Sequence, residues 1–237
     1  MSPKLLPLAA ALTVAGSAHA VTVNMTDFFF GPSADVSITG TEGSPSHDGP
    51  AGAFAGTLSD SAPVQPGHNS LAASSSPTSF VAWCAELTQS FNFHVNYEYT
   101  LVGGAAHFGA PRATDLSRLF TAAAANNFVF DSFGSAAFQA GIWEIIYEQS
   151  GVYSFNGGTL KAAPDGNPAD PAEVADFATV NGFLANLGQY GANYQINVLE
   201  NDTQQDFLIA TIPEPETWAL LGAGLGVIGF LRRRRKA

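Results

Sequence analysis

Residues 91–102 read FNFHVNYEYTLV, and apolar and polar side chains alternate along nearly the whole stretch. Successive side chains of a β-strand point to opposite faces, so this period of two predicts a strand with one buried and one solvated face. Strands of this kind are typical of antiparallel sheets. We therefore expect an antiparallel sheet to be built around residues 91–102.

Further strands are predicted on both sides of this stretch. β-branched and aromatic residues recur at near-alternate positions in five segments, which are 21–30, 35–40, 80–87, 194–199 and 206–212. Residues 41–79 are crowded with Gly, Pro and Ser, a composition that favours loop. The only strand we expect in that loop is a short edge strand near 54–58.

The middle of the chain is predicted to be helical. Apolar residues recur at helical spacing in residues 114–125 and 135–149. A third helix is predicted to open at Asp170-Pro171 and to close at Gly188, with Asp170 as its cap and Glu173 completing a capping box. The expected fold class is therefore α+β, with antiparallel β-strands and a central helical insertion.

The first 20 residues have the three parts of a secretory signal peptide. Lys4 is followed by an apolar run over residues 5–16 and then by Ala18-His19-Ala20, which matches an Ala-x-Ala cleavage site. We expect this N-terminal signal helix to be removed after Ala20. The alternative, an uncleaved anchor, would require the short run to span a hydrocarbon core of about 30 Å.

The last residues combine three elements in order. Pro213-Glu214-Pro215 precede an uncharged apolar stretch at 218–231, and a basic cluster follows at 232–236. We predict a single transmembrane helix at 218–231, although it falls short of the roughly 20 residues that span a bilayer easily. Basic residues beside a span stay on the cytoplasmic side, which leaves residues 21–211 on the far side of the membrane.

This tail, residues 212–237, resembles the PEP-CTERM sorting signal of Gram-negative bacteria that make extracellular polysaccharide. The resemblance implies that an exosortase, a membrane enzyme, recognises the tail near Pro213-Glu214-Pro215 and hands the protein to the outer surface. Membrane anchoring through the helix would then be transient, and the protein would end at the cell surface or outside the cell. A permanent single-span anchor is the alternative.

The predicted exported domain, residues 21–211, is strongly acidic. It holds three of the nine basic side chains and eighteen of the twenty acidic ones, which gives a formal charge of −15. This charge repels nucleic acid, so we expect no nucleic-acid partner. Because Cys84 is the single cysteine of the chain, no intramolecular disulfide can form.

Cys84 and a downstream glutamine are the strongest candidates for chemistry. Cys84 lies in WCAEL (83–87), and Gln139 lies in FQAGIWEI (138–145). Together these segments resemble the thioester domains of bacterial surface adhesins. In that family, a strand cysteine near an acidic residue bonds to the glutamine of a Thr-Gln-x-Ala-Ile/Val-Trp motif at a helix start.

The resemblance gives five residues a role: the thiol Cys84, the acyl donor Gln139, the acidic neighbour Glu86 and the motif end Ile142-Trp143. The sequence departs from the family at Phe138, where Thr is usual, and at Gly141, where Ala is usual. These departures leave the reactive pair intact and change its surroundings.

The residue types suit the chemistry. A cysteine thiolate is a strong nucleophile, and a glutamine amide held against it in a dry pocket can lose ammonia and leave a thioester. Unpaired N–H groups at a helix start would stabilise charge on the glutamine oxygen. An amine or hydroxyl of a partner protein or polysaccharide then becomes joined covalently. The protein would react once, as a surface adhesin or matrix cross-linker, and would not be an enzyme.

A second hypothesis involves no chemistry. A lone cysteine on an apolar strand is often a small core residue, and the protein would then be a non-reactive structural or interaction protein of the cell surface or biofilm matrix. The four histidines after residue 20 have no metal-ligand spacing, so neither a metal nor a cofactor is predicted. A Cys–His–Asp hydrolase is the weakest alternative, because no hydrolase motif surrounds Cys84.

Overall fold

The computed structural model describes residues 19–41, 44–58, 79–165 and 170–212. The predicted signal peptide up to Ala18, the predicted helix at 218–231 and the basic cluster at 232–236 lie outside these residues. Within the described part of the chain, no helix is long and apolar enough to cross a membrane.

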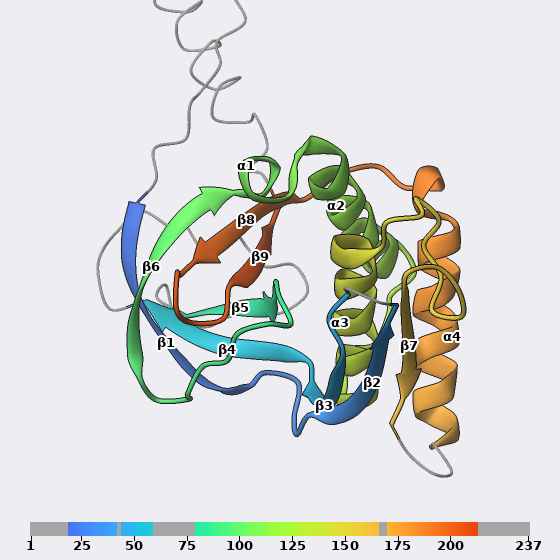
Figure 1. Cartoon of the computed structure of the whole chain (residues 1–237), viewed down its shortest axis with the longest axis horizontal. Helices are drawn as coiled ribbons and strands as arrows, with labels where there is room; N and C mark the ends of the chain where they lie inside the picture. Colours follow the sequence, from blue (N-terminus) through green and yellow to red (C-terminus); the bar gives the residue numbers. More distant parts are fainter. Residues whose placement is uncertain (1–18, 42–43, 59–78, 166–169, 213–237) are drawn as a thin grey trace, which may run out of the picture.

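Six antiparallel strands close into a barrel on one side of the molecule (Figure 1). Within this barrel, Val21, Val23 and Met25 are at most 3% exposed, whereas the residues between them are partly exposed. This alternation places apolar side chains inside, so the predicted antiparallel sheet is confirmed. In order around the barrel the strands are β1 (His19–Phe28), β4 (Ala53–Leu58), β5 (Ser79–Cys84), β9 (Phe207–Thr211), β8 (Gln195–Glu200) and β6 (Asn96–Gly103).

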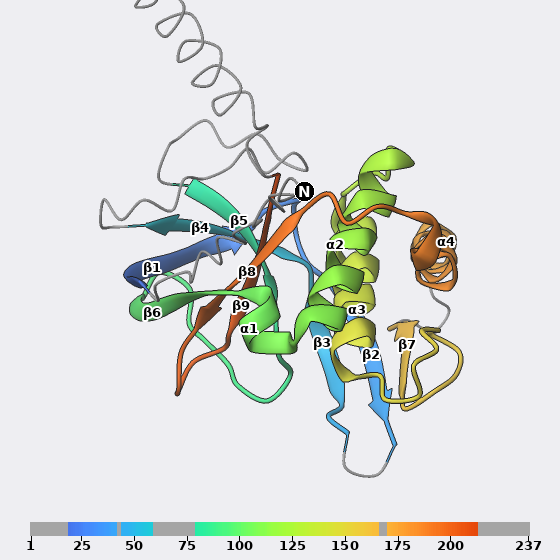
Figure 2. The same ribbon diagram turned by 90° about the horizontal axis from the view of Figure 1, so that it is seen from above.

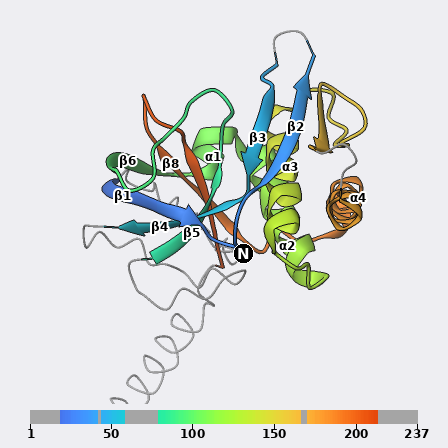
Figure 3. The ribbon, with the colours of Figure 1, turned by 90° about the horizontal axis from the view of Figure 1, so that it is seen from below.

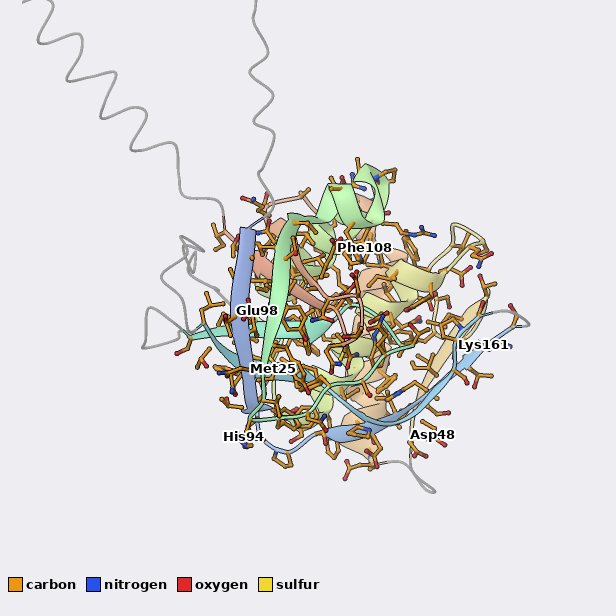
Figure 4. The ribbon with its side chains drawn as sticks, turned by 60° about the vertical axis from the view of Figure 1, so that its left-hand side comes forward. Met25, Asp48, His94, Glu98, Phe108 and Lys161 are labelled. Carbon is orange, nitrogen blue, oxygen red and sulfur yellow. The ribbon has the colours of Figure 1, made fainter. Side chains whose placement is uncertain are left out.

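A second antiparallel sheet and the helices form the other side. The sheet has the order β3 (His47–Ala51), β2 (Ala34–Gly40) and β7 (Leu160–Pro164). Figure 4 shows Asp48 and Lys161 on this sheet, across the molecule from Glu98 on the barrel. The helices follow β6 and precede β8, so the predicted central helical insertion is confirmed. They are α1 (Gly104–Phe108), α2 (Ala110–Ala125), α3 (Ser132–Tyr147), α4 (Pro171–Ala185) and a 3-10 turn at Leu187–Gln189.

Helix α3 is the central element of this side. All residues from 134 to 145 are buried, as expected for a helix that is covered on every side. The helix contacts α2, α4 and all three strands of the second sheet. Figure 2 shows α3 alongside α2 with the barrel on one side and α4 on the other, and Figure 3 shows β2 and β3 crossing it.

The strand predicted at 91–102 is correct only in its second half. β6 begins at Asn96, because His94 adopts a left-handed backbone conformation (φ 62°) that interrupts an extended chain. The N–H of His94 donates to the carbonyl oxygen of Met25 (2.8 Å), and Figure 4 shows the two residues close together. The alternating pattern therefore continues through a turn that precedes the strand.

Other boundaries also differ from the predictions. α1, β3 and β7 were not predicted, and β3 lies inside the segment 41–79 that was expected to hold only one strand. Its sequence HDGPA has no strand pattern, and pairing with β2 holds it. α3 begins at Ser132 instead of 135, because the Asp131 side chain caps it by accepting from Gly134 N (2.9 Å).

Helix α4 begins at Pro171 as predicted. The Asp170 side chain caps it by accepting a hydrogen bond from Ala172 N (2.8 Å). The reciprocal bond expected from Glu173 is not found among the described residues, where Glu173 is buried and its Oε1 has no partner. The helix ends at Ala185, and the 3-10 turn carries the chain through the predicted end at Gly188.

Glu144 and Glu148 lie one turn apart at the end of α3, and both are buried. Burial raises the pKa of Glu144 to about 8. A single hydrogen bond from Ser154 N (2.7 Å) acts to lower this pKa but does not outweigh burial. Burial also acts to raise the pKa of Glu148, but hydrogen bonds from the loop after α3 outweigh it and lower the pKa to about 2. Glu148 is therefore ionised at neutral pH, and it holds that loop through Thr159, Ser150 and Leu160.

We expect Glu148→Gln and Glu144→Gln to change the free energy of unfolding in opposite directions at neutral pH. A pKa held near 2 instead of 4.5 favours folding by about 3 kcal/mol at neutral pH, so Glu148→Gln should destabilise the protein by up to that amount. The loss should shrink as the pH falls through 4.5 towards 2. A raised pKa disfavours folding as the pH rises from 4.5 towards 8, so Glu144→Gln should stabilise the protein by about 1–3 kcal/mol near neutral pH.

Urea unfolding between about pH 3 and pH 8 measures both effects. Asp202→Asn, which removes an exposed carboxylate, is the control and should change the free energy of unfolding by less than about 0.5 kcal/mol. Effects of the same sign for the two glutamine variants, or effects independent of pH, would contradict the opposite ionisation of the two glutamates.

Candidate functional site

Cys84 is the last residue of β5, and its backbone faces Phe207 of β9. Five of the six residues of β5 are buried, because the barrel covers one face of the strand and the helices cover the other. Trp83 lies on the helical side, with its ring 4.9 Å from that of Phe138 of α3. The Cys84 side chain itself is only 5% exposed.

The side chain of Gln139 meets the backbone of Cys84 with both of its polar atoms. Cys84 N donates to Gln139 Oε1 (2.8 Å), and Gln139 Nε2 donates to Cys84 O (2.9 Å). Gln139 is fully buried, so these two bonds satisfy an amide that has no access to water. The structure thus brings together the two residues that the resemblance paired, although they are 55 positions apart.

Both pairing partners are held in a dry environment. Burial raises the pKa of the Cys84 thiol well above its usual range, and the nearby Glu86 carboxylate raises it further. Cys84 is therefore a neutral thiol at rest. The N–H of Cys84 points at the carbonyl oxygen of Gln139, where negative charge would develop if the carbonyl carbon were attacked.

The residues after Cys84 are fixed on two sides. Glu86 is half-buried, and its carboxylate accepts from Asp206 N (3.2 Å) and from the Thr88 hydroxyl (2.9 Å). Leu87 N donates to the Tyr147 hydroxyl of α3 (2.9 Å). The segment that follows the cysteine is therefore held by the turn before β9 and by α3.

One expectation about Gln139 is wrong. Gln139 is the eighth residue of α3, two turns inside the helix, so the unpaired N–H groups of the helix start do not reach it. The earlier start of α3, capped by Asp131, is the physical reason. The N–H of Cys84 takes the place of those groups, as described above.

A cavity of about 300 Å³ adjoins Cys84. Glu86 and Trp143 also line it, whereas Ile142 is a fully buried core residue. Several lining residues were not identified from the sequence, because they come from a low-complexity segment or from a turn. They are His47 and Phe54, together with Gln89, Phe91 and Phe93.

Phe138 and Gly141 both have packing roles in this structure. Phe138 is fully buried and its ring contacts those of Phe120 and Phe130 at about 5 Å, so it fills the core between the helices. A Cβ at Gly141 would lie 2.8 Å from Val180 Cγ1 of α4. The close approach of α4 to α3 therefore requires glycine at this position.

Of the remaining predicted site residues, only Ala20 lies within the described part of the chain, and it does not line the cavity. Ala20 is an exposed residue of β1 paired with Thr100, whereas Ala18 and Pro213-Glu214-Pro215 lie outside the described residues. Within the described residues there is also no group of three or more His, Cys, Asp or Glu side chains that could hold a metal ion.

Gly141→Ala and Gly182→Ala form a matched pair that tests the close packing of α3 on α4. A Cβ at Gly182, within α4, meets no atom within 4 Å, so Gly182→Ala should stabilise the protein by about 0.5–1 kcal/mol through helix propensity. Gly141→Ala gains the same stabilisation from helix propensity, but overpacking against Val180 should lower its free energy of unfolding by about 1–3 kcal/mol. In thermal unfolding, Gly182→Ala should therefore melt at a higher temperature than the wild type, and Gly141→Ala at a lower temperature than Gly182→Ala. Equal stability of the two variants would contradict the close packing of α3 on α4.

Comparison with known protein families assigns the C-terminal tail. Residues 211–236 match the family model of the PEP-CTERM protein-sorting motif. Comparison with curated proteins and comparison with solved structures give no match. None of these comparisons covers Cys84 or Gln139, so they give the thioester-domain resemblance no support. The chain carries a PEP-CTERM sorting motif, which is recognised by exosortase and implies export and sorting to the cell surface or the extracellular space.

Proposed function

We propose that Cys84 and Gln139 condense to an internal thioester, with which the exported domain attaches covalently to a partner at the cell surface. The observation that carries this proposal is the pair of hydrogen bonds between the Gln139 side chain and the Cys84 backbone. They hold the carboxamide carbon of Gln139 beside the residue whose sulfur would attack it. Such positioning replaces an improbable encounter by an intramolecular step.

The thioester forms by an acyl transfer that needs no oxidant. Cys84 Sγ attacks the carboxamide carbon of Gln139, and the Cys84 N–H bonded to Oε1 stabilises the oxyanion of the tetrahedral intermediate. The C–S bond forms first, and the C–N bond breaks when the intermediate collapses, so that Nε2 leaves as ammonia together with the thiol proton. Because the resting thiol is neutral, the proton transfer accompanies the attack.

A partner then resolves the thioester. An amine or a hydroxyl attacks the same carbon, a C–N or C–O bond forms, and the C–S bond breaks as the proton passes to Sγ. Gln139 is fully buried and does not line the cavity, so in this scheme the attacking group reaches the carbon from the side of Cys84, which does line it. The domain reacts once in this scheme and acts as an adhesin or a matrix cross-linker.

A non-reactive structural or interaction protein is the second candidate. The same two hydrogen bonds favour it, because a buried glutamine that satisfies a strand end is a stable structural clamp. In that case Gln139 keeps its amide and Cys84 remains a free thiol. The two functions therefore differ in the covalent state of two named residues.

Mass spectrometry of the intact exported protein tests the proposal. We expect a mass lower by one ammonia than that of the unreacted chain, and no alkylation of Cys84 under denaturing conditions. Methylamine should add once and restore an alkylatable thiol, because it opens the thioester. Cys84→Ala and Gln139→Glu should keep the full mass and take up no methylamine, and Cys84 of Gln139→Glu should remain open to alkylation.

Gln195→Glu, which alters an exposed glutamine of β8, is the matched control and should behave like the wild type. A wild-type protein that keeps the full mass and a free thiol at Cys84 would overturn the thioester and favour the structural clamp.

A further inference from the structure

The chain contains two Asn-Gly pairs, and the structure places them in different surroundings. Asn156-Gly157 lies in the loop between α3 and β7, whereas Asn181-Gly182 lies within α4. An asparagine side chain can react with the backbone nitrogen of the next residue, and this reaction is easiest before glycine, which has no Cβ to obstruct the approach. The local structure therefore decides which of the two pairs reacts in the folded protein.

The first pair lies on the surface of its loop. Asn156 is exposed, and among the described residues its carboxamide makes no hydrogen bond; its backbone N–H donates to the Ser154 hydroxyl (3.4 Å). The N–H of Gly157 donates to the carbonyl oxygen of Ser154 at 3.2 Å, which is at the long end for a hydrogen bond. A Cβ at Gly157 would meet no atom within 4 Å, so the backbone has room to turn there. The carboxamide of Asn156 can therefore approach the nitrogen of Gly157.

The second pair is held by two sets of hydrogen bonds. The Oδ1 atom of Asn181 accepts from Phe155 N (2.8 Å), which ties α4 to the loop that carries Asn156. Gly182 is an interior residue of α4, and in an α-helix each such N–H donates to the carbonyl oxygen four residues earlier. Attack of the Gly182 nitrogen on the Asn181 carboxamide would break both bonds. The helix therefore protects Asn181.

We infer that Asn156-Gly157 is a site of spontaneous modification in the folded exported protein, at which the asparagine converts to aspartate and isoaspartate. The Gly157 nitrogen loses its proton to hydroxide and attacks Cγ of Asn156. The bond between Cγ and Nδ2 then breaks, and Nδ2 takes a proton from water and leaves as ammonia. Water opens the resulting succinimide ring at either carbonyl carbon, which gives aspartate or isoaspartate and one new carboxylate.

The modification changes a loop that is fixed on both sides of Asn156. Phe155 N is bonded to Asn181 Oδ1 (2.8 Å), and Thr159 N is bonded to Glu148 Oε2 (2.7 Å). In isoaspartate the main chain runs through the side-chain carbonyl, so the segment between these two bonds becomes longer by one methylene group. The new carboxylate also adds negative charge to a loop that the ionised Glu148 holds. The isoaspartate form should therefore melt at a lower temperature than the unmodified protein.

This site is independent of the proposed thioester, although both lose ammonia. A succinimide at Asn156 lowers the mass of the intact chain by one ammonia, as a thioester at Gln139 would. Digestion with a glutamate-specific protease after denaturation separates the two sites, because Glu144 and Glu148 lie between Gln139 and Asn156. Glu173 likewise separates Asn156 from Asn181. Each loss of ammonia can therefore be assigned to one peptide.

The experiment follows both asparagines in the same sample. The exported protein is incubated in mildly alkaline buffer, once folded and once in urea, and the digests are analysed over time by mass spectrometry with separation of aspartate from isoaspartate. In the folded protein Asn156 should convert and Asn181 should stay unmodified, whereas in urea both should convert. Gly157→Ala should slow the conversion of Asn156 severalfold, because the new Cβ obstructs the attack. Gly182→Ala is the matched control and should leave the conversion of Asn156 unchanged.

Two results would overturn the inference. One is an Asn156 that converts in urea and stays unmodified in the folded protein; the other is an Asn181 that converts as fast as Asn156 while the protein is folded. Loss of ammonia confined to the peptide of Asn156 supports the modification site and contradicts the thioester. Loss confined to the peptide of Gln139, with Asn156 unmodified throughout the incubation, supports the thioester and overturns the modification site.

Discussion

The arrangement of this molecule depends on a buried carboxamide that has to be paired. Gln139 lies on the central helix with no access to water, and both of its polar atoms find their partners on the backbone of Cys84 at the end of β5. An apolar side chain of the same size would leave the N–H and C=O of Cys84 without these partners, at a cost of about 1–3 kcal/mol for each buried group. This pair of bonds therefore joins the helical layer to the barrel at one defined point. It also holds the amide carbon of Gln139 beside the backbone of the chain's single cysteine.

The cavity follows from the way the chain leaves that point. β5 ends at Cys84, and the following residues are fixed by Tyr147 of α3 and by the turn before β9. Residues 91–95 form a turn before β6, and the left-handed residue His94 lies within this turn. The turn brings phenylalanine rings against the end of the barrel. Trp143 Nε1 and Gln89 Oε1 are buried and have no hydrogen-bond partner among the described residues. Cys84 lines this cavity, whereas the amide of Gln139 is fully buried and does not, so a partner would have to reach the pair from the side of the cysteine.

Much of the fold follows from local sequence patterns, because hydrophobic periodicity is imposed by burial on one face. The strands that became β1, β2, β8 and β9 and the helices α2 and α3 have that periodicity. The sequence of β3, HDGPA, has no such periodicity, and the strand is held by pairing with β2 and by contact with α3. The pattern at 91–102 was misleading in its first half, because Phe91 and Phe93 are partly buried by packing on other rings and not by a sheet. The contact between Cys84 and Gln139 cannot be derived from spacing along the chain; only the family resemblance paired these residues. The glycine at 141 becomes intelligible only when Val180 of α4 is in place.

The proposed function requires the Cys84 thiol and the Gln139 amide to become joined by one bond. The most direct measurement is a crystal structure of the exported protein, with attention to Cys84 Sγ and the carboxamide carbon of Gln139. We expect continuous density between these two atoms, an Oε1 that still accepts from Cys84 N, and no nitrogen on the carbon. Separate side chains, with Gln139 keeping both hydrogen bonds to the Cys84 backbone, would contradict it.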